Sequence, residues 1–196
     1  MIKLDCEPLE REGLAALPGR KPVVLEIGFG RGELLLDLAS QDPERAHLGV
    51  EVSRKRVEKV ARRAARAQLS NLRLVHATAE YLVGRILPAA CVGECWINFP
   101  DPWPKKRHLK RRLIRPEFLE ALARVLAPGA RLHLATDHPG YAGWIAKALP
   151  SCPALRNRLA PASFGDRPPA RRQTAYEAEF LAAGRRIAYF ELERCE

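Results

Sequence analysis

Short apolar runs alternate with segments of helical periodicity along most of the chain. Six runs are rich in β-branched and other apolar residues: 22–28, 47–52, 71–78, 94–99, 130–137 and 186–194. Parallel strands that are buried on both faces give such runs, and the connection between two parallel strands is usually a helix. The pattern therefore predicts an α/β fold with an open, mostly parallel sheet and helices on both faces.

Amphipathic segments separate the predicted strands. We expect four helices: 32–41, 53–69, 116–126 and 141–149. Ser53 is a suitable N-cap for the second helix, and Pro116 suits the first turn of the third. Pro128 and Gly129 are expected to end that third helix. The second helix has one apolar face and one face of lysine and arginine side chains.

Length and composition favour a single domain. The 196 residues are enough for one domain with a large apolar core and too few for two ordinary ones. No linker separates two composition regimes, so residues 1–196 are predicted to form one domain, with 1–21 as a short N-terminal extension. The pattern weakens over 151–172, which is rich in proline and arginine, and we expect a loop-rich passage there.

The lack of an apolar targeting segment and the pattern of cysteines predict a cytoplasmic protein. No stretch approaches the roughly 20 apolar residues of a membrane span, and the N-terminus has no apolar signal-peptide core, so we expect no membrane association. Cys91 and Cys95 form a C-x-x-x-C pair, but no second pair or nearby histidine completes four ligands, so we expect no metal. The cysteines are odd in number and scattered along the chain, which predicts reduced thiols rather than a disulfide framework. They are Cys6, Cys91, Cys95, Cys152 and Cys195.

The chain carries an excess of positive charge. It has 33 Lys and Arg against 23 Asp and Glu, a formal net charge of +10. Such a balance favours a polyanionic partner, with nucleic acid as the first candidate. A solvated cationic face without a ligand gives the same count, so charge alone leaves both possibilities open.

A glycine-rich turn follows the first predicted strand. Residues 26–32 are Glu-Ile-Gly-Phe-Gly-Arg-Gly, at the place where an open α/β sheet holds a nucleotide-like ligand. The spacing of Gly28, Gly30 and Gly32 differs from the G-x-G-x-x-G of dinucleotide sites. It resembles the first motif of class I methyltransferases instead. Their cofactor, S-adenosylmethionine, has no phosphate and carries a sulfonium and an ammonium, which suit the carboxylate of Glu26.

Two further strand ends offer contacts to a nucleoside. Glu51 ends the second strand, where an acid in Rossmann-like proteins accepts hydrogen bonds from the two ribose hydroxyls. Dinucleotide-binding proteins and class I methyltransferases both use this acid, so Glu51 does not discriminate between a dinucleotide and S-adenosylmethionine. At the end of the third strand, where an acid usually contacts the adenine, the register places Thr78, with Glu80 two positions on.

A proline-rich segment follows the fourth strand. Residues 99–104 are Phe-Pro-Asp-Pro-Trp-Pro, and the prolines around Asp101 and Trp103 restrict the backbone. A preset loop at the carboxyl edge of the sheet suits the positioning of reacting groups. A basic run comes next, and it is predicted to grip a phosphate backbone: Lys105, Lys106, Arg107, His108, Lys110, Arg111, Arg112 and Arg115.

Residues 99–112 resemble the signature F-P-D-P-W-P-K-x-R-H-x-K-R-R of the bacterial tRNA (guanine-N7-)-methyltransferases. Thr136–Asp137 and the segment 174–177, similar to the family's T-K-F-E, extend the resemblance over residues 22–194. It implies a single Rossmann-like class I methyltransferase fold with seven strands. It also implies methyl transfer from S-adenosylmethionine to N7 of a guanine in the variable loop of tRNA, by a monomer or a homodimer.

The resemblance assigns roles to individual residues. It implies that Asp101 is the catalytic carboxylate. The contacts to S-adenosylmethionine that follow are Glu26, Gly28, Gly30, Gly32, Glu51, Thr78 and Asp101. The contacts to the tRNA substrate are Lys105, Asp137, Thr174, Ala175, Tyr176 and Glu177. Ala175 stands where the family has a basic residue.

Other functions fit parts of the same pattern. Asp101-Pro102-Trp103 resembles the Asp/Asn-Pro-Pro-aromatic motif of amino-group methyltransferases, but only one proline precedes Trp103 and the basic run is foreign to that motif. A non-catalytic RNA-binding protein on a methyltransferase fold is a second alternative, against which the intact Glu26 and Asp101 argue. An NAD-linked dehydrogenase is a third, disfavoured by the glycine spacing.

Overall fold

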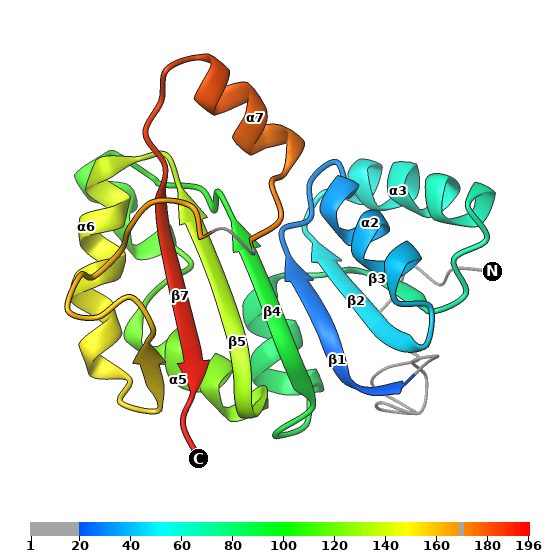
Figure 1. Cartoon of the computed structure of the whole chain (residues 1–196), viewed down its shortest axis with the longest axis horizontal. Coiled ribbons are helices and arrows are strands. Elements are labelled where there is room, and N and C mark those ends of the chain that lie inside the picture. The colour runs from blue at the N-terminus through cyan, green and yellow to red at the C-terminus, as the bar shows by residue number, and fades with distance from the viewer. Residues whose placement is uncertain (1–19, 169–170) are drawn as a thin grey trace.

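Figure 1 shows the computed structural model, which describes residues 20–168 and 171–196. Within these ranges seven strands form one sheet in the order β3-β2-β1-β4-β5-β7-β6. Their bounds are β1 (Arg20–Ile27), β2 (Arg45–Glu51), β3 (Leu72–His76), β4 (Val92–Asn98), β5 (Leu126–Thr136), β6 (Leu155–Asn157) and β7 (Ala188–Arg194). Cys6 and nearly all of the predicted extension 1–21 lie outside the described residues.

The sheet is mostly parallel, as predicted. The pairs β3-β2, β2-β1, β1-β4 and β4-β5 are parallel, whereas β7 is antiparallel to both β5 and β6. From β1 the chain builds outward to β2 and β3, then returns to β4 and β5 on the other side of β1. The strand order therefore reverses between β1 and β4, and ligands of such sheets bind beside the carboxyl ends of the strands at that point.

Helices cover both faces of the sheet, which confirms the expected α/β architecture. In Figure 1, α2 and α3 lie on one face, α5 and α6 lie on the other, and α7 stands above the carboxyl edge. The α-helices of the described ranges are α2 (Glu33–Gln41), α3 (Arg54–Arg66), α4 (Ala79–Tyr81), α5 (Pro116–Val125), α6 (Pro139–Ala148) and α7 (Ala175–Ala182). The π-helical turn η2 (Leu82–Ile86) and the 3₁₀ turns η3 (Lys106–Arg111) and η4 (Leu149–Ser151) complete them.

Alternation along the central strands separates two apolar layers. Leu25 of β1 packs in one large buried cluster with Leu119 of α5 and Ile145 of α6. Val24, one position earlier, points to the opposite face and packs with Leu34 of α2. Since successive side chains of a strand point to opposite faces, each apolar strand fills both layers.

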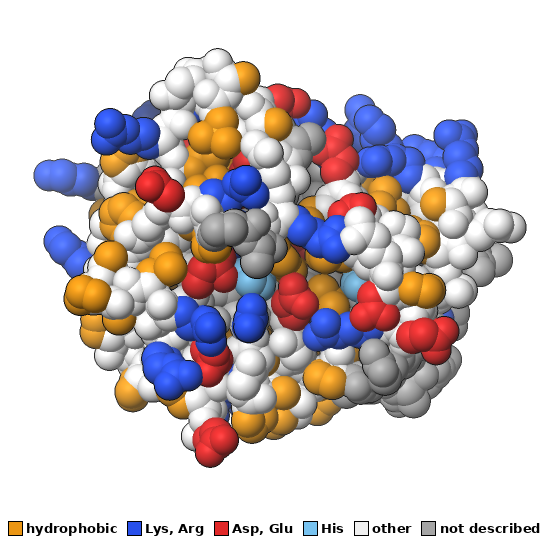
Figure 2. All heavy atoms as spheres, in the orientation of Figure 1, with side chains coloured by type: hydrophobic (Ala, Val, Ile, Leu, Met, Phe, Trp, Pro, Cys, Tyr) orange, Lys and Arg blue, Asp and Glu red, His pale blue; other side chains and the backbone are white. Residues whose placement is uncertain are grey.

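Beyond α2 the second face of the sheet is polar. The side chains of β4, β5 and β7 that share this face include Glu94, His133 and Glu191, and the latter two are buried. Figure 1 shows the passage between β6 and α7 crossing this face, where the other strands have helices. In Figure 2 acidic and basic side chains intermingle over the same area. This part of the sheet is therefore held by hydrogen bonds and ion pairs.

One predicted helix boundary is confirmed and another is wrong. Ser53 is the N-cap residue of α3, but its side chain makes no capping hydrogen bond; its N–H donates to Oε1 of Glu51 at 2.9 Å. Helix α5 ends at Val125, before Pro128 and Gly129, which lie inside β5. A shift of register between β4 and β5 absorbs these two residues, so they interrupt a strand rather than end a helix.

The passage 151–172 is mostly loop, as expected, but it contains the short strand β6. Helix α7 was not predicted, and it begins with a capping box between Thr174 and Glu177. A single domain over 1–196 stays a prediction.

Candidate functional site

Two adjoining hollows lie at the carboxyl ends of β1, β2 and β4. The glycine-loop pocket has a volume of about 380 Å³, and its lining includes Glu26, Gly28, Asp101 and Tyr176. The Glu51 pocket has a volume of about 340 Å³ and is lined by Glu51 on one side and Trp103 on another. Both pockets are bordered by residues 98–101, so Asp101 lies at the boundary between them.

The glycine loop leaves room for a ligand. Gly28, Gly30 and Gly32 have φ values of +71°, +51° and +70°, in the left-handed region that favours glycine. A Cβ on Gly28 would meet no protein atom within 4 Å, so a side chain there would project into the pocket. A Cβ on Gly32 would lie 2.6 Å from Cγ1 of Val60, so this glycine allows the loop to pack against α3.

Glu26 is a buried carboxyl with an unused oxygen. Its side chain is only 4% exposed, and Oε2 has no hydrogen-bond partner among the described residues. Burial raises the pKa of Glu26 to about 8, with a backbone hydrogen bond from Leu35 opposing the shift and the charge of Glu51 adding to it. An unpaired buried oxygen is costly, and a cationic or N–H-bearing ligand would satisfy it.

Glu51 fixes the glycine loop from the neighbouring strand. Oε2 accepts a hydrogen bond from the N–H of Gly30 at 3.1 Å, and Oε1 accepts one from Ser53. The guanidinium of Arg56 lies 3.6 Å from Oε2. A carboxylate accepts up to about four hydrogen bonds, so Glu51 retains acceptor capacity for hydroxyl groups in its pocket.

Thr78 occupies a structural position beside the Glu51 pocket. It is the N-cap residue of α4, and its Oγ1 accepts a hydrogen bond from the N–H of Tyr81 at 3.2 Å. The residues of this region that line the pocket are Ala77, Ala79 and Glu80. The predicted cofactor contact at Thr78 therefore has no support in this geometry, whereas Glu80, two positions on, does line the pocket.

The segment after β4 is held in a strained conformation. Phe99 and Trp103 have positive φ values of 53° and 41°, a conformation that costs about 1–3 kcal/mol for such residues. The N–H of Phe99 donates to the carbonyl of Ala135 at 2.8 Å, and its ring packs edge-on against Phe180 of α7 at 5.1 Å. These contacts fix the chain immediately before Asp101, which is exposed at the boundary of both pockets.

The basic run divides into exposed and buried members. Arg111 lies over the Trp103 ring at 5.1 Å, and His108 packs edge-on against the same ring. The exposed members are Lys105, Lys106, Arg107, Lys110 and Arg111, and His108 and Arg115 are partly buried. Lys105 lies outside the lining of both pockets.

Arg112 is turned into the protein. It is 5% exposed, and its Nε donates to the carbonyl of Pro102 at 2.8 Å. Its guanidinium lies 4.9 Å from the Trp144 ring and 5.1 Å from the Tyr141 ring. The geometry does not support the prediction that Arg112 contacts RNA. The side chain instead stabilises the proline-rich loop by its hydrogen bond to Pro102 from within the protein.

Helix α7 brings part of the predicted substrate set to the glycine-loop pocket. Thr174 and Tyr176 line this pocket, and Ala175 begins the helix. Glu177, predicted to contact the substrate, is completely buried and serves the capping box instead. Asp137 lines the pocket as well, with Oδ2 accepting a hydrogen bond from Nη1 of Arg185 at 2.6 Å.

Arg171 is a central residue that the sequence pattern did not reveal. Its side chain is 1% exposed, and its guanidinium donates to Oδ1 of Asn98 at 2.5 Å and to Oε1 of Glu191 at 3.0 Å. Its Nε lies 3.5 Å from Oε1 of Glu177. One side chain thus joins the end of β4, the middle of β7 and the start of α7. In the sequence it is only one of five arginines in the loop-rich passage 151–172.

Glu191 extends this network across the sheet. Its Oε2 lies 2.5 Å from Nδ1 of His133, whose ring stacks on Trp96 at 4.0 Å. Burial alone would raise the pKa of Glu191, but the hydrogen bond from His133 and the charge of Arg171 hold it below its ordinary value. The carboxylate of Glu191 is therefore ionised opposite the buried guanidinium.

No group of three or more His, Cys, Asp or Glu that could hold a metal occurs in residues 20–168 and 171–196. In the same ranges no helix is long and apolar enough to cross a membrane. Cys91, Cys95 and Cys152 are buried free thiols, and Cys195 is partly buried.

Comparison with known proteins gives consistent matches. A family model described as "Putative methyltransferase" matches residues 20–190. The tRNA (guanine-N(7)-)-methyltransferase of Halorhodospira halophila is 46% identical over 166 residues, which cover 85% of this chain and 72% of the relative. The enzyme of the same description from Leifsonia xyli is 43% identical over 181 residues, covering 92% and 79%.

Solved structures show the same fold. The 16S rRNA methyltransferase KamB superposes with a TM-score of 0.65 at 22% identity, covering 97% of this chain and 92% of that one. A SAM-dependent methyltransferase from Aquifex aeolicus gives a TM-score of 0.61 at 14% identity, covering 96% and 93%. At these identities the likeness shows the fold alone.

The buried Glu26 predicts a pH-dependent stability. Its pKa rises from 4.5 to about 8 on folding, so between these values the folded state binds more protons than the unfolded state. The free energy of unfolding should therefore fall as pH rises from 4.5 to about 8, and level off above that. Glu26→Gln should remove this part of the slope, as measured by urea unfolding across the range.

Glu120→Gln, at an exposed position of α5, is the matched control and should leave the slope unchanged. An unaltered slope in Glu26→Gln would contradict the assignment.

Proposed function

The chain belongs to the tRNA (guanine-N7-)-methyltransferase family, and we propose that its two pockets serve the transfer of a methyl group from S-adenosylmethionine to N7 of a guanine in tRNA. The matching structures confirm the Rossmann-like class I methyltransferase fold expected from the sequence. The observation that carries the proposal for the site is the position of Asp101 at the boundary between the glycine-loop pocket and the Glu51 pocket.

The residues present suit S-adenosylmethionine. The unpartnered Oε2 of Glu26 suits a ligand with positive charge, and the open space beside Gly28 accommodates a ligand close to the backbone. Glu51 has acceptor capacity for the ribose hydroxyls, and Glu80 lies where an adenine contact belongs. When bound, S-adenosylmethionine supplies an electrophilic methyl group on a positively charged sulfur.

Guanine N7 is an in-plane lone pair that needs no deprotonation before it attacks. The bond from N7 to the methyl carbon forms as the carbon–sulfur bond breaks, so positive charge moves onto the purine. The main task of the protein is therefore alignment. A fixed carboxylate at Asp101 stabilises the spreading charge, an effect commonly worth about 3 kcal/mol.

The target base must leave its stack before it reaches this site. In A-form RNA the N7 edge faces a deep, narrow groove that side chains cannot enter. Tyr176 lines the glycine-loop pocket and is 36% exposed, with its ring 6.3 Å from that of Phe99. Trp103 does not line this pocket; it lines the Glu51 pocket, where its ring is in contact with Arg111 and His108. We therefore place the flipped guanine beside Tyr176.

Exposed cations surround this entrance. Arg31 lies 4.7 Å from the Tyr176 ring and forms a hydrogen bond of 2.7 Å with Glu179 of α7. Figure 2 shows lysine and arginine side chains gathered at the end of the molecule that carries α3. Together with the exposed part of the basic run, they offer contacts to the phosphates around the target. The cytoplasmic location and the choice between a monomer and a homodimer stay predictions.

The direct test is incubation of the purified protein with labelled S-adenosylmethionine and unmodified tRNA, followed by nucleoside analysis. We expect label in 7-methylguanosine. Label in an N-methylated adenosine or cytidine would support the amino-group alternative instead. Binding of S-adenosylmethionine and tRNA without any methylated product would support a non-catalytic RNA-binding protein.

Replacement of Asp101 should act on the transfer step. Asp101→Asn removes the negative charge and keeps the size of the side chain, so single-turnover transfer should fall by about 100-fold. The dissociation constant for tRNA should change little, because Asp101 repels phosphate rather than attracting it. Glu120→Gln is the control for loss of one carboxylate. Near-normal turnover in Asp101→Asn would refute the catalytic assignment.

The two parts of the basic run should respond differently to substitution. Lys110→Ala with Arg111→Ala should weaken tRNA binding and reduce the salt dependence of the binding constant by about 1–2 units. Arg112→Ala should instead lower the melting temperature, because its guanidinium is buried against Pro102 and two rings. Lys147→Ala, exposed on α6, is the control. Equal effects of both changes on the salt dependence would contradict this division.

Arg171 should behave as a positioning residue. Arg171→Lys keeps a charge but cannot direct hydrogen bonds to both Asn98 and Glu191. A small displacement of the β4 end can cost about 100-fold in rate, so we expect kcat to fall while KM for S-adenosylmethionine stays near the wild-type value. Arg172→Lys is the matched control, because this neighbour is only partly buried and pairs with Asp37 at the surface. A lower melting temperature with unchanged kcat would mean a purely structural role.

A further inference from the structure

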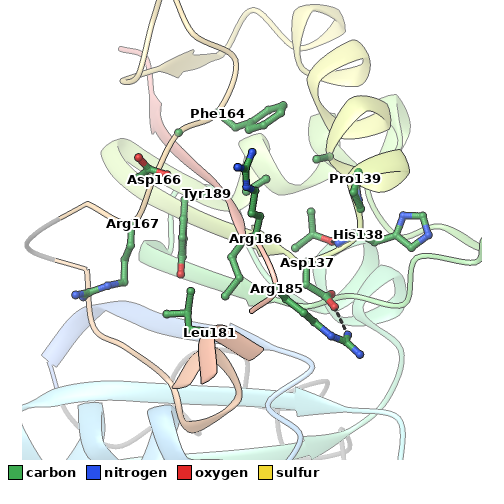
Figure 3. Close-up of a pocket in the computed structure, with 15 residues that line it drawn as sticks. Asp137, His138, Pro139, Phe164, Asp166, Arg167, Leu181, Arg185, Arg186 and Tyr189 are labelled. Carbon is green, nitrogen blue, oxygen red and sulfur yellow. Dashed lines mark hydrogen bonds and ion pairs between the residues drawn. The ribbon is translucent and has the colours of Figure 1, made fainter. Parts of the chain in front are cut away.

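A third cavity is lined by residues of α6, α7 and β7 (Figure 3). Its volume is about 970 Å³, and we call it the Phe164 cavity after a residue on its rim. Asp137 lines both this cavity and the glycine-loop pocket. The two spaces therefore meet at one side chain.

The walls of the Phe164 cavity expose apolar surface. Phe164 is 39% exposed and Leu181 is 44% exposed, although side chains of this kind are usually covered. The Phe164 ring packs against the buried Phe190 at 5.2 Å, which holds it in place while part of it faces outward. Ile187 adds buried apolar surface to the lining. A flat aromatic ligand would find a platform here.

The same cavity carries cations that no carboxylate of the described residues neutralises. Arg186 is exposed and forms no hydrogen bond or ion pair within the ranges 20–168 and 171–196, and Figure 3 shows it extending from the start of β7 toward Phe164. Arg167 donates only to the carbonyl of Arg171, at 2.7 Å. Asp137 is already paired with Arg185, and among the described residues Asp166 is the one acid of the lining that pairs with no cation.

We propose that the Phe164 cavity binds the nucleotide next to the target guanine in the same tRNA. This inference rests on the proposed function. The base would lie against Phe164 and Leu181, and the phosphate would meet Arg186 and Arg167. Proteins hold single-stranded RNA by this combination of aromatic platforms and cations.

The position of the cavity supports this occupant over an unrelated ligand. A strand that places its guanine in the glycine-loop pocket continues past Asp137 into the neighbouring space. Helix α7 contributes to both spaces, with Tyr176 on the first and Leu181 on the second. One short helix thus contacts the target base and its neighbour together, so the enzyme would bind a dinucleotide rather than a single flipped base.

A double-mutant cycle tests the proposal: substitutions of Phe164 in the protein are combined with abasic sites in the tRNA, and the binding affinity of each combination is measured. Unmodified tRNA is prepared with an abasic nucleotide on the 5′ side or the 3′ side of the target guanine. Phe164→Ala should weaken binding of ordinary tRNA by about 10-fold, in the range expected for loss of one stacked base. On one of the two abasic tRNAs the same substitution should have almost no effect, because its partner base is already missing.

Additive effects on both abasic tRNAs would overturn the proposal. Phe164→Leu keeps the apolar contact with Phe190 while it removes the ring, and it replaces Phe164→Ala in the cycle if the alanine variant has a lowered melting temperature.

Arg186→Ala tests the phosphate contact independently of the apolar wall. It should weaken tRNA binding several-fold and lower its salt dependence by about one unit. Arg131→Ala, which removes an exposed arginine from the middle of β5, outside the cavity lining, is the matched control and should leave both quantities unchanged. If Arg186→Ala and Arg131→Ala had the same tRNA affinity and the same salt dependence, the proposed phosphate contact in the Phe164 cavity would be wrong.

Failure of this inference is distinguishable from failure of the proposed function. If wild-type protein forms 7-methylguanosine but Phe164 and Arg186 variants bind tRNA normally, the proposed reaction stands and the neighbouring-nucleotide site is wrong. If no 7-methylguanosine forms while the binding cycle gives the expected coupling, the cavity stands and the reaction is wrong.

Discussion

One buried guanidinium connects the parts of the site. Arg171 is held by Asn98 and Glu191 and faces Glu177, so three elements far apart in the sequence share one charge. An arginine can be buried only where carboxylates and hydrogen bonds replace its water, and removal of one partner leaves another charge unpaired. The arrangement therefore fixes where β4 ends and where α7 begins, relative to each other. On the polar second face of the sheet, Glu191 of β7 pairs with this charge and is itself bonded to His133 of β5.

The proline-rich loop is restrained on both of its sides. Ahead of Asp101, the strained Phe99 is held by its hydrogen bond to Ala135 and by Phe180 of α7. Behind it, Arg112 binds the carbonyl of Pro102 from within the protein. A carboxylate between two such fixed points keeps its direction without moving to meet the substrate, which is the condition for electrostatic preorganisation. The cost of the positive φ values is offset by these contacts.

The sequence was most informative where function and local pattern coincide. The parallel strands follow from continuous apolar runs, and the glycine turn and the proline-rich loop carry their own motifs. Arg112, Arg171 and Glu177 could not be placed in this way, because a charged residue looks the same in sequence whether it is exposed or buried. Their partners lie on other elements, and only the folded chain brings them together. Pro128 and Gly129 were wrongly predicted to end a helix, because these residues usually break regular structure. Here they lie within a strand, where a register shift between β4 and β5 accommodates them.

The raised pKa of Glu26 couples ligand binding to proton release. A cation beside this carboxyl favours its ionised form, so under the proposed function binding of the methyl donor at neutral pH would release a proton to the solvent. Affinity for the donor should then increase with pH until the free protein has itself lost that proton, near pH 8. Under the proposed function, a single buried acid therefore links the affinity for the methyl donor to pH.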